Sequence, residues 1–99
     1  MRAKIWNYRK WIKETNPQKL IDFFDNALIK SEFLILNKAE HYFEPYGYTR
    51  LYLLGESHFA LHTFPEENKT YIELSSCNKE KYKTFINMLK RSEMNGECE

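Results

Sequence analysis

The chain has 99 residues, of which 42% are hydrophobic and 16% aromatic, and its formal charge at neutral pH is +1. This length indicates a single domain over residues 1–99 with an aromatic core, and so short a chain buries only a modest share of its surface. Because the net charge is near zero, the chain has no overall positive electrostatic field that would attract nucleic acid or anionic membranes. The sequence has no run of roughly 20 apolar residues and no secretory signal, so we expect a cytoplasmic protein.

Local patterns predict the elements of the first half of the chain. Aromatic, aliphatic and basic residues mix over residues 3–14, which predicts an amphipathic edge strand. Asn16 and Pro17 form a helix start, and apolar residues at helical spacing extend that helix to about Lys30. Residues 33–43 predict a second strand, after which Pro45, Tyr46 and Gly47 form a turn.

The second half reads as three more strands and a closing helix. The strands are predicted over residues 48–54, 58–64 and 70–77, with a turn at 65–69. Asn78 can cap the final helix, whose apolar face holds Tyr82, Phe85, Ile86 and Leu89. The order β-α-β-β-β-β-α predicts an α+β fold, a mostly antiparallel β-sheet with two helices packed on one face.

Residues 55–66 carry the strongest chemical signal, and they read Gly-Glu-Ser-His-Phe-Ala-Leu-His-Thr-Phe-Pro-Glu. A serine hydroxyl is a poor nucleophile unless its target is strained or a base takes its proton. Gly55 would tolerate a distorted backbone beside such a target. If Ser57 attacks the carbonyl of Glu56, the peptide becomes an ester. Loss of the Ser57 α-proton then expels that ester and leaves a pyruvoyl group.

Two nearby side chains could complete this chemistry. His62 is the candidate base for the α-proton, since an imidazole titrates near neutral pH. An unbroken strand would place Ser57 and His62 on opposite faces, so the scheme predicts a bend or bulge close to Ser57–His58. After maturation a substrate amine would form a Schiff base with the pyruvoyl carbonyl, and the Cys77 thiol could then reprotonate the substrate α-carbon.

These residues resemble the small prokaryotic S-adenosylmethionine decarboxylase proenzymes, in which the matching serine becomes a covalent pyruvoyl group. The resemblance is tightest over residues 43–77 and is carried by Phe43-Glu44-Pro45-Tyr46-Gly47, Thr49, Glu56-Ser57-His58, His62-Thr63, Pro65-Glu66 and Cys77. The spacing of 20 residues from Ser57 to Cys77 (77 − 57) is also that of the family. The resemblance implies self-cleavage between Glu56 and Ser57 into a β chain 1–56 and an α chain 57–99.

The resemblance also implies an activity, which is conversion of S-adenosylmethionine to the aminopropyl donor of spermidine synthesis. The roles that it implies are processing for Thr49, His62 and Cys77, stacking of the substrate adenine for Phe43 and Phe64, and a ribose hydroxyl contact for Glu66. It further implies a homodimer of processed protomers with sites near the subunit interface. The chain departs from the family at Phe64, where tryptophan is usual, and at Gly55 and Ala60, where a hydroxyl residue is common.

Other interpretations of the same residues stay open. A pyruvoyl-dependent decarboxylase of ornithine or arginine would use the same motif, and Phe64 with the basic first strand motivates it. A relative that no longer cleaves could act as a regulatory or binding subunit. We expect His41 and His58 to be structural, and Cys77 and Cys98 to be thiols. No ligand set with metal spacing and no glycine-rich phosphate loop occurs, so we expect no metal.

Overall fold

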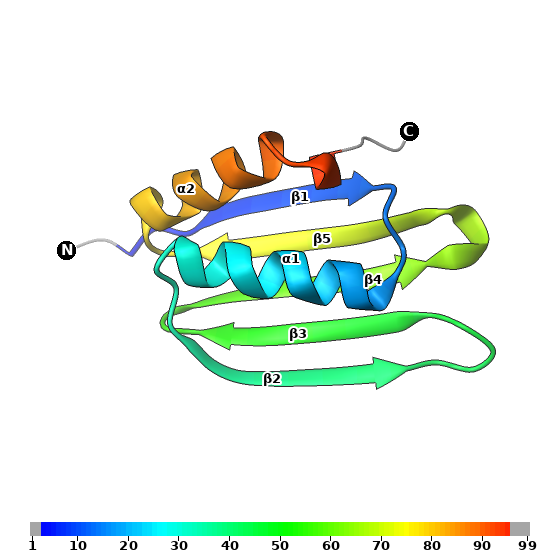
Figure 1. Ribbon diagram of the computed structural model, residues 1–99. Helices are drawn as coiled ribbons and strands as arrows, with labels where there is room; N and C mark the ends of the chain where they lie inside the picture. Colours follow the sequence, from blue (N-terminus) through cyan, green and yellow to red (C-terminus); the bar gives the residue numbers. More distant parts are fainter. Residues whose placement is uncertain (1–2, 96–99) are drawn as a thin grey trace.

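The computed structural model describes residues 3–95, and within them the chain forms a five-stranded sheet with two α-helices on one face (Figure 1). The elements are β1 (Trp6–Ile12), α1 (Pro17–Lys30), β2 (Ile35–Tyr42), β3 (Tyr48–Leu54), β4 (Ser57–Phe64), η1 (Pro65–Glu67), β5 (Lys69–Ser76), α2 (Lys79–Lys90) and η2 (Glu93–Asn95). All strand pairs are antiparallel, in the order β1-β5-β4-β3-β2. The predicted α+β fold is confirmed, with β1 at an edge as expected.

Both helices begin where the sequence predicts, because an asparagine caps each one. The Asn16 side chain accepts a hydrogen bond from the Lys19 amide at 3.1 Å, and Pro17 is the first helical residue. The Asn78 side chain accepts from the Lys81 amide at 3.0 Å. Each such cap stabilises a helix by about 1 kcal/mol.

The core lies between the two helices and the face of the sheet that they cover. Its fully buried apolar members are Ile12, Leu20, Phe24, Ala27, Leu28, Leu61, Ile72, Leu74, Phe85 and Leu89. Phe59 of β4 joins the two helices, since its ring centroid lies 4.9 Å from that of Phe24 and 5.4 Å from that of Phe85. Alternate residues of β4 and β5 therefore face the helices, and the intervening residues lie on a second face that no described element covers. We call this second face the open face.

A partly buried polar cluster ties α1 to β2 and β3. The Arg50 guanidinium donates to the Tyr52 hydroxyl at 2.8 Å and to Glu40 at 3.0 Å. The Tyr52 hydroxyl donates to Asp25 of α1, and the Tyr48 hydroxyl donates to Glu40 of β2. Burial and the hydrogen bond to Glu40 raise the pKa of Tyr48 to about 12. Because its ions are paired and bonded, this cluster holds β3 firmly against α1.

Two smaller observations concern membrane spans and cysteines in the described part of the chain. Among residues 3–95, no helix combines the length and the apolar character that a bilayer span requires. Cys77 is a free thiol, whereas Cys98 lies outside the described residues.

Candidate active site

The peptide bond between Glu56 and Ser57 lies where a tight turn meets a strand. Ser57 is the first residue of β4, directly after the two-residue turn Gly55–Glu56 that follows β3. Glu56 has a φ of 55°, in the left-handed region that side chains other than glycine rarely adopt. Such a conformation costs roughly 1–2 kcal/mol. The distortion expected at Gly55 therefore lies one residue later, on the residue whose carbonyl Ser57 would attack.

The Ser57 side chain points toward the helix-covered face, and the residue as a whole is 8% exposed. It donates a hydrogen bond to the Ser76 hydroxyl of β5 at 3.1 Å. Ser76 was missed by the sequence analysis, because its proximity to Ser57 follows from the register of β4 against β5. The alternation of β5 could have placed Ser76 on the core face, but not opposite a particular residue.

Cys77 directly follows β5, so it lies at the same end of the sheet as Ser57. Its thiol donates to a carboxylate oxygen of Glu56 at 3.7 Å. We call Glu56, Ser57, Ser76 and Cys77 the hairpin-end cluster. Beside it opens a cavity of about 500 Å³, whose apolar lining includes Ile5, Leu36, Leu53 and Leu54. The structure thus brings together the predicted cleavage bond and the predicted proton donor.

The other predicted residues meet at the opposite end of the sheet. A cavity of about 270 Å³ is lined by Phe43, Thr49, His62, Phe64 and Glu66, and we call it the loop-end pocket. Within it the Thr49 hydroxyl lies 2.9 Å from Nδ1 of His62. The three residues with implied substrate contacts, Phe43, Phe64 and Glu66, thus line one pocket. Thr49 and His62, for which the resemblance implies processing roles, line the same pocket and not the site around Ser57.

One expectation about the strand between these two sites is wrong. β4 pairs residue for residue with both β3 and β5 from Ser57 to His62, without the bend or bulge predicted close to Ser57–His58. The bend occurs earlier, in the Gly55–Glu56 turn. Ser57 and His62 are five residues apart, which is about 17 Å along a strand. Because this separation is odd, their side chains lie on opposite faces of the sheet. Within one chain, His62 therefore does not reach Ser57.

Aromatic residues of β1 and β5 border the loop-end pocket, which the sequence analysis did not anticipate. The Trp11 ring lies 5.7 Å from that of Phe64 and 5.2 Å from that of Tyr71. The Tyr71 ring in turn stacks on His62 at 6.3 Å. Burial and a hydrogen bond to Glu73 raise the pKa of Tyr71. The first strand, predicted as an amphipathic edge strand, also supports the pocket through the contact of Trp11 with Phe64.

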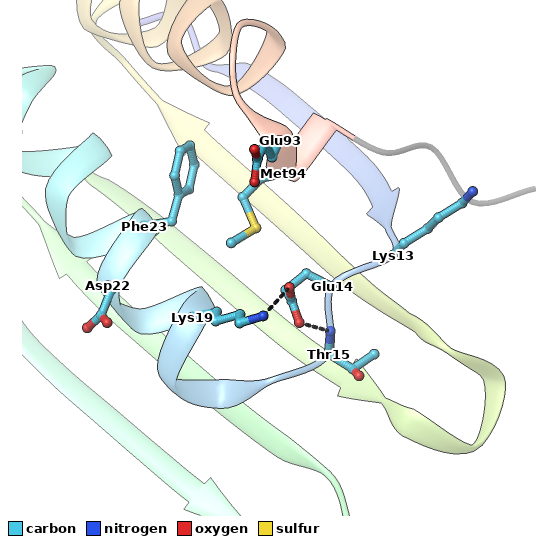
Figure 2. Close-up of a pocket in the computed structure, with 8 residues that line it drawn as sticks. All are labelled: Lys13, Glu14, Thr15, Lys19, Asp22, Phe23, Glu93 and Met94. Carbon is cyan, nitrogen blue, oxygen red and sulfur yellow. Dashed lines mark hydrogen bonds and ion pairs between the residues drawn. The ribbon is translucent and has the colours of Figure 1, made fainter.

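Another cavity, larger than these two, lies on the helix side between the β1–α1 loop, α1 and η2 (Figure 2). Its volume is about 710 Å³, and charged residues of both signs line it, including Lys13, Glu14, Lys19, Asp22 and Glu93. Lys19 and Glu14 form an ion pair at 4.0 Å across its rim. None of the predicted site residues lies there, so size alone does not mark the candidate site.

Metal ligands do not cluster in the part of the chain that the structure describes: no three His, Cys, Asp or Glu side chains are placed to hold an ion. The hairpin-end cluster offers instead a hydroxyl, a thiol and a carboxylate around one strained turn. This set suits acyl transfer and proton transfer.

Comparison with known protein families shows to which family the chain belongs. The sequence model of the S-adenosylmethionine decarboxylase family matches residues 9–95. The chain belongs to this family. The resemblance drawn from the motif around Ser57 is thereby confirmed, while the roles of individual residues in this S-adenosylmethionine decarboxylase family member stay predictions.

Individual relatives match over shorter segments. The S-adenosylmethionine decarboxylase proenzyme 2 of Bacillus cereus is 46% identical over 43 residues, which are 43% of this chain and 35% of that protein. The S-adenosylmethionine decarboxylase proenzyme of Thermosipho africanus is 31% identical over 62 residues, which are 63% of this chain and 48% of that protein. The chain thus spans about half or less of these relatives.

A solved structure shares the fold over nearly the whole chain. The crystal structure of the adenosylmethionine decarboxylase from Aquifex aeolicus matches with a TM-score of 0.78, over 99% of this chain and 86% of that chain. The sequence identity is 15%, so this likeness concerns the architecture: an antiparallel sheet with helices on one face.

Proposed function

We propose that this protein is a self-cleaving, pyruvoyl-dependent S-adenosylmethionine decarboxylase that makes the aminopropyl donor for spermidine synthesis. One observation carries the proposal: Ser57 follows a glutamate held in a left-handed conformation, and Cys77 lies against that same glutamate. Membership of the family supports it independently. The cytoplasmic location expected from the sequence stays part of the proposal.

Self-cleavage begins with attack of the Ser57 Oγ on the carbonyl carbon of Glu56. A C–O bond forms, the amide C–N bond breaks, and the hydroxyl proton ends on the nitrogen of Ser57. A base then removes the Ser57 α-proton. The main-chain carboxylate of Glu56, which is the acid part of the ester, then leaves from the β-carbon of residue 57. Tautomerisation and hydrolysis release ammonia and leave the pyruvoyl group, which supplies a carbonyl that accepts the electrons of a decarboxylated substrate.

The two separated half-sites support a homodimer in which each active site uses two chains. Exposed leucines of β3 lie on the open face, where Leu51 is 47% and Leu53 is 54% exposed, and Leu51 pairs with the small Ala60 of β4. Two such faces pack about 10 Å apart. A two-fold axis lying across the strands reverses their direction, which sets the loop-end pocket of one copy over the hairpin end of the other.

This arrangement also gives His62 its role as the base. The Ser57 hydroxyl points toward the helices. The α-carbon is tetrahedral, so a base that approaches from the open face would meet the α-hydrogen of Ser57 and not its hydroxyl. His62 faces that side and has Thr49 to orient its ring. His62 of one copy therefore serves Ser57 of the other.

The loop-end pocket is the proposed site for the nucleoside part of the substrate. Phe43 and Phe64 present aromatic faces for the adenine, and Glu66 presents a carboxylate for the ribose hydroxyls. Its 270 Å³ lies just below the roughly 300–1,000 Å³ usual for small-molecule sites. A pocket completed by the second copy accounts for that small size. Cys77 would then deliver a proton to the substrate α-carbon.

Intact-mass analysis tests the cleavage. The wild type should give two fragments that meet at Glu56–Ser57, with ammonia lost from residue 57. Ser57→Ala should stay whole, whereas the control Ser31→Ala, which removes another buried serine hydroxyl, should cleave normally. A wild type that stays whole would contradict the proposal and favour a non-cleaving regulatory relative.

Carbon dioxide release tests the substrate. The processed protein should release it from S-adenosylmethionine and not from ornithine or arginine. Release from ornithine or arginine alone would contradict the substrate while leaving the pyruvoyl chemistry intact.

A further inference from the structure

The Ser57 hydroxyl is oriented by a buried partner that the proposed chemistry has not yet used. Its single proton is donated to Ser76 Oγ at 3.1 Å. Ser76 is completely buried, and it pairs with Ser57 across β4 and β5. The contact therefore joins two residues that the sheet itself holds in register.

Ser76 has no hydrogen-bonding capacity left for other partners. A serine hydroxyl has one donor and two acceptor positions. Ser76 donates to the Asn78 carbonyl at 3.1 Å and accepts from the Asn78 amide at 3.0 Å. Its second acceptor position takes the Ser57 proton. Asn78 is in turn the cap of α2, so the Ser76 oxygen is held by the helix start and cannot rotate freely.

This fixed acceptor determines where the Ser57 lone pairs point. Because the proton of Ser57 is directed at β5, the lone pairs lie on the other sides of the oxygen and are left to approach the preceding carbonyl carbon. Orientation of this kind is a large part of the advantage of an intramolecular reaction, and misplacing a reacting atom by about 1 Å can lower a rate by about 100-fold.

We propose that Ser76 is a positioning residue for the first step of self-cleavage, the attack of Ser57 on Glu56. The inference rests on the proposed function. In this step the C–O bond forms, the amide C–N bond breaks, and the Ser57 proton passes to its own nitrogen. Ser76 keeps its proton throughout and acts by holding the nucleophile.

A purely structural role is the competing explanation, since the bond from the Asn78 amide to Ser76 is a common turn motif that would serve stability alone. Thr70 provides a matched control for that role. It is also fully buried, lies on the same face of β5, and donates to the Glu14 carbonyl. Thr70→Val and Ser76→Ala each remove one buried hydroxyl from the strand.

The experiment measures ester formation in a His62→Ala background, where the second step is blocked and hydroxylamine cuts the accumulated ester. Adding Ser76→Ala should slow ester formation by about 10- to 100-fold. Adding Ser76→Thr should restore it to within about threefold, and adding Thr70→Val should leave it unchanged. Thermal melts of the same variants report stability, which Ser76→Ala and Thr70→Val should lower by comparable amounts.

The outcomes separate the two proposals. If the wild type cleaves and Ser76→Ala forms ester at the parent rate, the positioning role is wrong and the proposed function stands. If the wild type never cleaves, both are wrong. Should Ser76→Ala fail to fold, Ser76→Cys keeps nearly the same shape with a weaker acceptor. A normal rate of ester formation in Ser76→Cys would overturn the positioning role, and a slowed rate would support it.

Discussion

The hairpin end and the loop end of the sheet differ in how their polar groups are held. At the hairpin end, Ser57 is nearly buried and its hydroxyl is bonded to a buried partner. At the loop end, Phe43 is half exposed and the pair of Thr49 and His62 faces the open side of the sheet. At the end proposed to make and break bonds, the nucleophile is thus held by contacts within one chain. The end proposed to recognise the substrate is open and awaits a second surface.

Mixing two inactive variants tests this division most severely. Ser57→Ala alone should not cleave, and His62→Ala alone should stop at an ester that hydroxylamine breaks. In mixed dimers, the Ser57→Ala chain supplies its His62 to the Ser57 of its partner, so the His62→Ala chain should be processed. Intact mass distinguishes the fragments. Mixed dimers that form but leave the His62→Ala chain at the ester would show that the two ends do not meet.

Changing the aromatic surface of the loop-end pocket should alter recognition without altering cleavage. Phe64→Ala removes one of the two proposed stacking faces, which is worth about 0.5–1.5 kcal/mol. The KM for S-adenosylmethionine should rise about two- to tenfold in the processed enzyme, and Phe64→Trp should lower it. An unchanged KM in both variants would place the adenine elsewhere.

Relieving the backbone strain at Glu56 should have a smaller effect, on stability and on the rate of cleavage, and Glu32 provides a matched control. Glu56→Gly and Glu32→Gly each relieve a positive φ, of 55° and 67° respectively, and each should stabilise an uncleaved Ser57→Ala chain by about 1 kcal/mol. With Ser57 intact, Glu56→Gly should also slow cleavage, because glycine adopts this φ without the steric strain that glutamate stores beside the scissile bond. Glu32→Gly should cleave at the wild-type rate. Denaturant unfolding and fragment formation measure the two effects.

The smallest effect on cleavage is expected from the polar cluster that ties α1 to β2 and β3. The folded state raises the pKa of Tyr48 to about 12, from an ordinary value of 10.0. The folded chain therefore holds this proton more tightly, and the resulting stability is present below pH 10 and lost as the pH rises toward 12. Tyr48→Phe should show a shallower loss of stability across that window in alkaline denaturation curves. Equal slopes in the two proteins would contradict the shift.

Much of the fold could be predicted because its signals are local. Asn16 and Asn78 cap their helices with side chains three residues from their partners, and the predicted bounds of β3 match those observed. Short-range patterns of this kind survive in the folded protein because packing does not oppose them. The motif likewise singled out Phe43, Phe64 and Glu66, which line the loop-end pocket together.

The relations across strands could not be predicted in the same way. The parity of Ser57 and His62 correctly indicated opposite faces, but the bulge proposed to reunite them is absent from the continuous pairing of β4. The contact of Ser57 with Ser76 depends on the register of two strands joined through a separate turn. Likewise the positive φ of Glu56 comes from closing a two-residue turn between β3 and β4. The sequence analysis assigned the distorted backbone to the neighbouring Gly55, because glycine is the residue that tolerates such a conformation most easily.

The strand order has a consequence for the protein after the proposed cleavage. A cut before Ser57 leaves one piece with β1, α1, β2 and β3, and another with β4, β5 and α2. In the sheet, β5 is paired with β1 and β4 with β3. Both outer strands of the shorter piece are therefore hydrogen-bonded to strands of the longer piece. The two polypeptides should therefore co-elute until denaturant is added, and a fresh terminus can be generated without dismantling the scaffold that presents it.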